Sequence, residues 1–266
     1  MIDKHKSNQL KSSLVRASFL LVFTWITGCT TASIAPQESN PPPSSVRPDQ
    51  IVIYDFAVSA EDVKENQGIL DRAYRASTQN EEQEQQAKLE LGHSLAKDLA
   101  DDLVKQLQGL GFNASRLPRG SRASGTNVLV LDGDFVDIDE GNRARRLIIG
   151  FGAGASKLDT QVMLGLLSST GAQSPLLNFS THAESGKMPG AAVTMGAGAA
   201  AQGGATAASA AASAGMSGAK IYGSMMTTLA ANTSKQITAY LSQYFAVQGW
   251  ISQEQAEKVK YSEKRE

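Results

Sequence analysis

The clearest periodicity in the chain is a row of leucines that recur every four residues between positions 87 and 108. Charged side chains lie mostly between them, so a helix over this segment would have one apolar and one polar side. The stripe consists of Leu91, Leu95, Leu99, Leu103 and Leu107. Gly109 and Gly111 follow as a stop signal. We therefore predict an amphipathic helix over residues 87–108.

Strand patterns lie on both sides of this helix. "IVIYDFAV", residues 51–58, is rich in β-branched and aromatic residues, and "FNASRL", residues 112–117, resembles a short returning strand. A strand, a helix and a strand this close together predict one α/β unit. The polar residues 59–86 between the first strand and the helix are expected to form a surface insertion, with some helix around Ile69–Tyr74.

The next part of the chain has β-type patterns. "NVLVLDGDFVDI", residues 127–138, predicts a strand, and Glu140-Gly141-Asn142 predicts a turn after it. "RRLIIGFG", residues 145–152, is then expected to pair back as an antiparallel hairpin. "KLDTQVMLGLL", residues 157–167, alternates like a half-buried strand, and "SPLLNFSTHA", residues 174–183, is the last strand candidate.

A second helical pattern covers residues 220–248, and Lys235 is the only charge between Lys220 and Glu254. Gly249 is expected to end this helix, Trp250 and Ile251 to dock on the core, and residues 253–266 to form a frayed polar tail. The predicted fold is α+β. One mixed or antiparallel sheet of five or six strands carries helices 87–108 and 220–248 on one side, in a single domain over residues 51–252.

Residues 190–219 are unusual because 14 of these 30 residues are alanine, 7 are glycine and none is charged. The segment is long enough to span a bilayer, but alanine is nearly neutral for insertion and the glycines and polar residues oppose it. Two short helical halves, 191–202 and 205–217, would be broken at Gly203-Gly204. Three interpretations remain open: an interaction hairpin, a flexible linker, or a membrane-inserting element of an oligomer.

The first 29 residues have the order of a bacterial lipoprotein signal. Basic residues precede an uncharged, mostly apolar run from Ala17 to Ile26 that is too short to span a bilayer. The run ends in a sequence that resembles the lipobox, which consists of Ile26, Thr27, Gly28 and Cys29. This resemblance implies cleavage between Gly28 and Cys29, removal of residues 1–28 and acylation of Cys29. The alternative is an ordinary signal peptide or membrane anchor that happens to contain a cysteine.

The expected anchor also suggests a location. Residues 29–50 are rich in proline and serine and are expected to form an extended tether with a reach of about 60–70 Å. Thr30, rather than aspartate, follows the cysteine, which favours the outer membrane, facing the periplasm, in a Gram-negative cell. Cys29 is the only cysteine, so no intramolecular disulfide is possible.

Composition and motifs argue against several function classes. A net charge of −1 gives no electrostatic case for nucleic-acid binding. "GFGAGA", residues 150–155, fits a G-x-G-x-x-A pattern, but a strand pattern rather than a helix follows it, so no nucleotide site is expected.

Metal binding and catalysis are not expected either. An EF-hand loop would need an oxygen ligand at the position of Val136. We instead expect the acidic run to form a solvated strand end near Arg143, Arg145 and Arg146. The first two aspartates of the run are expected on one face of the strand and the last two on the other. The run comprises Asp132, Asp134, Asp137, Asp139 and Glu140. His93 and His182 lie in no hydrolase motif. The chain is therefore expected not to be an enzyme, and no cofactor is expected.

The order of these features resembles the bacterial lipoprotein family known as domain of unknown function 4410. The resemblance covers residues 49–252 and is most specific in "GDF…EGN…RR…GFGAG", residues 133–154. It implies a fold and an envelope context without an activity. We therefore expect a membrane-anchored, non-enzymatic binding or assembly module that contacts the bilayer through Cys29 and binds an envelope protein or its own copies. The alternative is an oligomeric pore or secretion subunit that assembles through residues 190–219.

Overall fold

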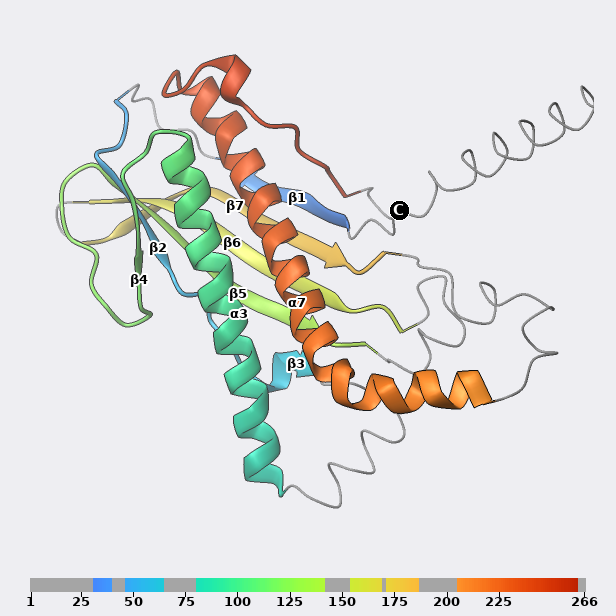
Figure 1. Cartoon of the computed structure of the whole chain (residues 1–266). Helices are drawn as coiled ribbons and strands as arrows, with labels where there is room; N and C mark the ends of the chain where they lie inside the picture. Colours follow the sequence, from blue (N-terminus) through green and yellow to red (C-terminus); the bar gives the residue numbers. More distant parts are fainter. Residues whose placement is uncertain are drawn as a thin grey trace, which may run out of the picture.

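The computed structural model describes residues 31–39, 46–64, 80–141, 154–168, 171–186 and 205–262. These residues form one mixed sheet of seven strands in the order β1-β7-β6-β5-β2-β4, with β3 paired to β5 (Figure 1). The strands are β1 (Thr31–Ser39), β2 (Gln50–Tyr54), β3 (Val63–Lys64), β4 (Ala114–Leu117), β5 (Val128–Asp139), β6 (Lys157–Leu167) and β7 (Gln173–Glu184). The helices are α3 (Glu81–Gly109) and α7 (Ala205–Val247), and two 3-10 turns lie at Ala60–Asp62 and Gln253–Gln255.

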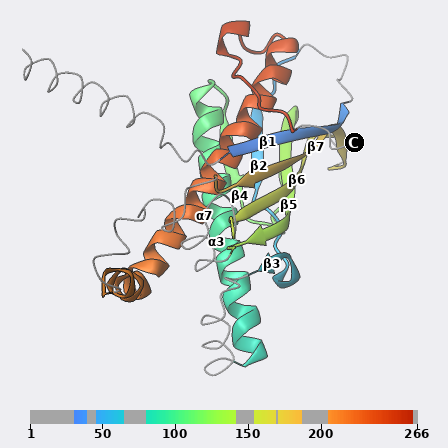
Figure 2. The ribbon, with the colours of Figure 1, turned by 90° about the vertical axis from the view of Figure 1, so that its right-hand side faces the viewer.

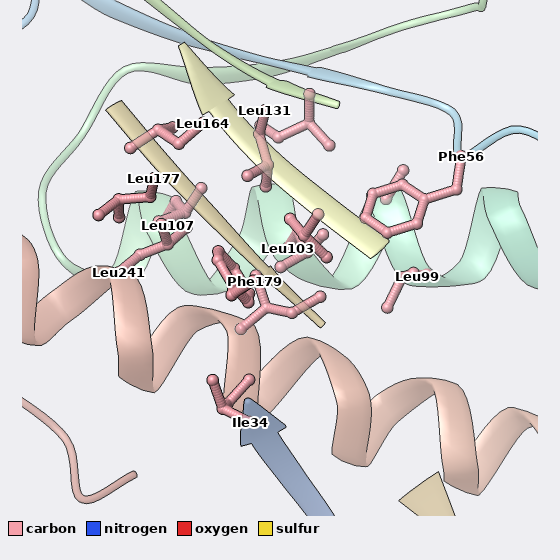
Figure 3. Packing of buried hydrophobic residues seen from close by; sticks show 14 of the residues in the cluster. Ile34, Phe56, Leu99, Leu103, Leu107, Leu131, Leu164, Leu177, Phe179 and Leu241 are labelled. Atoms are coloured by element: carbon pink, nitrogen blue, oxygen red, sulfur yellow. The ribbon is translucent and has the colours of Figure 1, made fainter. Parts of the chain in front are cut away.

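Helices α3 and α7 lie side by side on one face of the sheet, as Figures 1 and 2 both show. The leucine stripe of α3 is buried against this face, with Leu99, Leu103 and Leu107 fully inaccessible to solvent. They meet side chains from the sheet and from α7, among them Leu131, Leu164, Leu177, Phe179 and Leu241 (Figure 3). The predicted α+β class, with the helices on one side, is confirmed.

Helix α3 begins at Glu81, six residues earlier than predicted. Asn80 forms a capping box, because its side chain accepts a hydrogen bond from the Gln83 N–H at 2.9 Å while the Gln83 side chain accepts one from the Asn80 N–H at 3.1 Å. Glu81, Glu82 and Glu84 in the first turn complement the helix dipole. The polar run that resembled a surface insertion is therefore the start of the helix, and residues 65–79, including 69–74, lie outside the described residues.

The predicted α/β unit is present. β2 and β4 are parallel neighbours, with Ile51 opposite Ala114, and α3 connects them across the sheet. β5 lies on the other side of β2, also parallel, with Gln50 opposite Val128. Parallel pairs need such a crossover connection, which explains the helix between the first two strands.

The expectation of a free tether over residues 29–50 is wrong for its first part. Residues Thr31–Ser39 form β1, an edge strand paired antiparallel with β7 from Thr31 opposite Glu184 to Ser39 opposite Leu177. Ala32 and Ile34 point into the core and are 4% and 0% exposed. Among residues 31–37, whose burial the structure describes, only these two side chains are buried, which explains why the segment has the polar composition of a linker. Pro36 lies where the register shifts, a position at which the missing N–H is tolerated.

The C-terminal tail is also more ordered than predicted. The tail forms hydrogen bonds with both backbone groups of Ile34. The Ile34 N–H donates to the Lys260 carbonyl oxygen, and the Ser262 N–H donates to the Ile34 carbonyl oxygen, each at 2.8 Å. The Glu257 N–H donates to the Ser242 hydroxyl of α7 at 2.9 Å. The tail thus covers part of the free edge of β1, which blunts an edge that would otherwise be open to pairing.

The predicted hairpin partner of β5, residues 145–152, lies outside the described residues. Among the described strands, the antiparallel neighbour of β5 over its whole length is β6, from Val128 opposite Leu167 to Asp139 opposite Lys157. β2 and β3 pair in parallel with parts of the other edge of β5.

Close packing on β5 depends on a glycine. Gly133 lies against the ring of Phe56, and a Cβ placed on it would come within 2.6 Å of the Gln161 carbonyl oxygen and 2.7 Å of the ring. A side chain at this position therefore requires the neighbouring strand or the aromatic ring to move.

Helix α7 starts at Ala205, fifteen residues before the predicted start at 220. Half of the alanine- and glycine-rich segment therefore belongs to the same helix that packs on the sheet, whereas residues 190–204 lie outside the described residues. The first part of α7 bends away from the direction of the rest (Figures 1 and 2). Gly249, with φ at +74°, ends the helical region, and Trp250 and Ile251 are buried as predicted.

Candidate functional site

Within the described residues, neither helix covers the opposite face of β5, β6, β7 and β1, which we call the open face. One end of this side of the sheet is apolar: Val52, Val128, Val130 and Leu167 are buried there with Ala123 of the loop after β4. The rest carries polar side chains, because the residues that alternate with the core positions point outward. The geometry of the open face is therefore fixed by the sheet itself.

The acidic residues of β5 all lie on this face. Leu129, Leu131, Phe135 and Ile138 belong to the main core, and a register shift between Phe135 and Asp137 changes the alternation at Val136, which is exposed. The aspartates on both sides of the bulge consequently share one face, so the expectation that Asp137 and Asp139 face the opposite way from Asp132 and Asp134 is wrong. A β-bulge of this kind redirects every side chain beyond it.

The strand register places one outward residue from each of four neighbouring strands in a row: Asp137 of β5, Asp159 of β6, His182 of β7 and Ser33 of β1. The Nδ1 atom of His182 lies 2.5 Å from Oδ1 of Asp159, and its Nε2 atom lies 3.9 Å from Glu184. The hydrogen bond to Asp159 raises the pKa of His182, and the negative charges of Asp159 and Glu184 act in the same direction. This pair gives the open face a charge that depends on pH near neutrality.

Two cations form ion pairs with aspartates of β5. Lys64 Nζ lies 2.8 Å from Asp137, and this hydrogen bond raises the pKa of Lys64. Arg119 reaches Asp132 at 2.6 Å and also donates to the carbonyl oxygen of Gly133 at 2.7 Å. Both aspartates are therefore partly neutralised, and such half-exposed ion pairs contribute modestly to stability.

The face also carries neutral hydrogen-bonding groups. The Gln161 amide donates to Asn178 at 2.6 Å and to Gln37 at 2.8 Å, which links β6 to β7 and to β1. Among the described side chains, six carboxylates and three basic groups share this surface, so its charge is negative at a pH at which His182 is neutral. The carboxylates are those of Asp132, Asp134, Asp137, Asp139, Asp159 and Glu184, and the cations are Lys64, Arg119 and Lys157.

A second charged cluster lies where β2 and β4 end. Arg116 of β4 makes a bidentate pair with Asp55 and a further contact with Asp101 of α3 at 3.3 Å. These three side chains are about a quarter to a third exposed. The hydrogen bond to Asp55 raises the pKa of Arg116, and the cluster joins the helix to the parallel strands. We assign it a structural role.

The residues predicted from sequence are distributed as follows. Cys29 and the remaining lipobox residues, Ile26, Thr27 and Gly28, lie outside the described residues. Most of "GFGAGA" does too, but β6 rather than a helix begins at Lys157 directly after it, as the sequence predicted. His93 is exposed on α3. Among the described residues, no three His, Cys, Asp or Glu side chains are grouped so as to hold a metal ion, and no helix in these ranges is long and apolar enough to cross a membrane.

Sequence reasoning missed the pairing of Asp159 with His182. The two residues are outward positions on successive predicted strands, so the signal was present in the alternation. Their contact depends on the register of β6 against β7, which also contains a shift between Leu164 and Gly165. Alternation alone does not fix a register.

We compared the chain with known proteins, solved structures and protein families. No curated protein matches the chain. A solved structure of a PelC dodecamer from Paraburkholderia phytofirmans is similar over 77% of this chain and 98% of that chain, with 11% sequence identity and a TM-score of 0.25, which is too low to support a conclusion about this chain. The family described as "Domain of unknown function (DUF4410)" matches residues 51–202, more than half of the chain. The chain belongs to this family.

Proposed function

We propose that this protein is a lipid-anchored, non-enzymatic binding or assembly module of the bacterial cell envelope, with its folded domain facing the periplasm. The observation that carries the proposal is the continuity between anchor and fold: the lipobox ends at Cys29, and β1 begins at Thr31. Acyl chains on Cys29 would be attached two residues before an edge strand of the sheet. Two or more chains hold a protein at a membrane essentially permanently.

The binding role is supported by the open face. It offers hydrogen-bond donors, acceptors and charges on a rigid sheet, fixed by register and by ion pairs such as Lys64–Asp137. A module attached to the membrane also meets its envelope partner at a raised effective concentration. The partner bound there would be an envelope protein or a second copy of this chain.

The first test is acylation at Cys29. The full chain, grown in a Gram-negative host with an alkyne-tagged fatty acid, should carry the label and sediment with membranes. The variant Cys29→Ser should lose both properties, whereas the matched control Thr31→Ser, two residues downstream, should keep them. Label retained in Cys29→Ser would show that the anchor lies elsewhere and would refute the proposal.

A second test addresses which membrane is occupied. We expect the wild-type protein in the outer-membrane fraction of a sucrose gradient, and Thr30→Asp in the inner-membrane fraction, because aspartate after the acylated cysteine is the usual retention signal. The control Thr30→Ser should stay with the outer membrane. Wild type in the inner membrane would contradict the outer-membrane assignment while leaving the anchor intact.

One observation favours an oligomeric assembly as a second candidate function. The second half of the uncharged alanine- and glycine-rich segment, residues 205–219, is continuous with the part of α7 that packs on the sheet, yet its axis turns away from that part (Figure 2). Small residues allow close approach of helices. Light scattering of the acylated protein in mild detergent should then give a defined oligomer for wild type and a folded monomer for a variant lacking residues 190–219. A monomeric wild type would remove this candidate.

A further inference from the structure

One end of the sheet holds the start of β1. Thr31 lies opposite Glu184, Glu184 opposite Lys157, and Lys157 opposite Asp139, so these four residues form the last row of β1, β7, β6 and β5. We call this row the anchor end. The opposite end of the same strands holds Leu167 and Gln173, which are paired with each other.

The link between Cys29 and the anchor end is short. Two residues of extended chain span at most about 7 Å, so the Cα atom of Cys29 lies within that distance of the Cα atom of Thr31. The expected tether with a reach of tens of ångströms is therefore absent from the anchor side of the domain. Any group attached to Cys29 stays beside this row.

β1 is also firmly held in the sheet. Ile34 is fully buried, its N–H and carbonyl are both bonded to the C-terminal tail, and Ala32 is 4% exposed. Extending the linker by releasing the first residues of β1 would expose both side chains and break pairs with β7. The start of β1 is therefore a fixed attachment point, and its residues do not lengthen the linker to Cys29.

The first fifteen residues of α7, 205–219, carry no charge. In Figure 1 this part of the helix extends outward on the side of the molecule toward which the arrowheads of β5 and β7 point. A helix without charges can lie against a headgroup layer without the cost of removing ionised groups from water. The anchor end carries one cation, Lys157, and two carboxylates, Asp139 and Glu184, and Lys64 of β3 is paired with Asp139 beside it.

On the basis of the proposed lipid anchor, we infer that the anchor end of the sheet lies against the bilayer surface, with the strands running away from it. Lys157 is two strands from Thr31, about 10 Å, and is thus held near the headgroups. Gln173 lies about 35 Å farther along the strands, at the end exposed to the periplasm. The partner of the anchor end is the lipid headgroup layer itself, which leaves the open face accessible from the side.

The test compares two exposed positions at opposite ends. Lys157→Cys and Gln173→Cys are each made in the acylated full-length protein, in which Cys29 is blocked by lipid, so that each variant has one free thiol for an environment-sensitive fluorophore. The labelled proteins are placed in vesicles that contain a nitroxide-headgroup lipid. We expect loss of most of the fluorescence at position 157 and almost no loss at position 173.

A variant with a longer linker tests whether the quenching depends on the short distance between Cys29 and β1. Twelve Gly/Ser residues inserted between Thr30 and Thr31 add a root-mean-square reach of about 20 Å and should remove most of the quenching at position 157. Equal quenching at both positions, stronger quenching at 173, or unchanged quenching at 157 after the insertion would each overturn the inference. Mass spectrometry and flotation of the same preparations identify failure of the proposed function separately: a protein without acyl chains that does not float lacks the anchor itself.

Discussion

Replacing Ile34 with alanine tests whether residues 31–39 are a structural strand or a tether. Ile34 is 0% exposed and belongs to the main core, where it lies close to α7 (Figure 3). Truncating a buried isoleucine to alanine costs about 2–5 kcal/mol, through lost burial and the cavity left behind. A side chain on a solvated tether would cost almost nothing. We expect Ile34→Ala to lower the free energy of unfolding by about 3 kcal/mol.

The assay is urea unfolding of the chain starting at Thr30, which removes the predicted signal and Cys29, the proposed acylation site. Trp250 is then the only tryptophan and is 7% exposed in the core, so its fluorescence reports unfolding. With a urea dependence of about 2–3 kcal/mol per molar, the midpoint should fall by about 1–1.5 M. The exposed neighbour Thr31→Ala should shift stability by less than about 0.5 kcal/mol. Equal midpoints for Ile34→Ala and wild type would show that β1 is not part of the folded domain.

Three further predictions concern the open face and the sheet. The raised pKa of His182 means that the folded protein favours the protonated ring, so its stabilising effect is complete below pH 6.5 and is lost as the pH rises through the folded-state value. Urea midpoints measured from pH 5 to 9 should show this decline in wild type and not in His182→Gln; a parallel profile for the variant would contradict the pairing. Gly133→Ala should destabilise the protein by about 1–3 kcal/mol because its Cβ meets backbone, while Gly109→Ala, with nothing within 4 Å, should be neutral or slightly stabilising, and thermal unfolding distinguishes them. Arg116→Lys keeps the charge but loses the bidentate geometry, and a decrease of about 1 kcal/mol is expected; no change would show that the cluster is not a structural tie.

Local patterns predicted the parts of the fold whose signal lies within one segment. The leucine stripe predicted α3 because the helical period of its apolar residues is the same whatever surface the helix packs against. The alternation of apolar and polar residues over 157–167 likewise predicted β6, because it does not depend on which strands lie beside it. The family resemblance was carried by the same segments and is confirmed over residues 51–202.

The sequence predictions were wrong for segments whose structure depends on residues far away in the chain. β1 looks like a linker because an edge strand with one buried face needs only Ala32 and Ile34 in the core, and β7 supplies its hydrogen bonds. The tail was expected to fray because the backbone groups of Ile34 that hold it are more than two hundred residues away.

The candidate site divides in the same way. The sequence by itself determined the lipobox at Cys29 as a candidate anchor and the acidic run of β5, because both are read from adjacent residues. Only the tertiary structure decided that a bulge turns all four aspartates to one face, that Asp159 meets His182, and that residues 31–39, just after the candidate anchor, form an edge strand of the sheet. The physical reason is that strand register and edge pairing are set by hydrogen bonds and packing between distant segments, whose energies do not appear in the local pattern of either one.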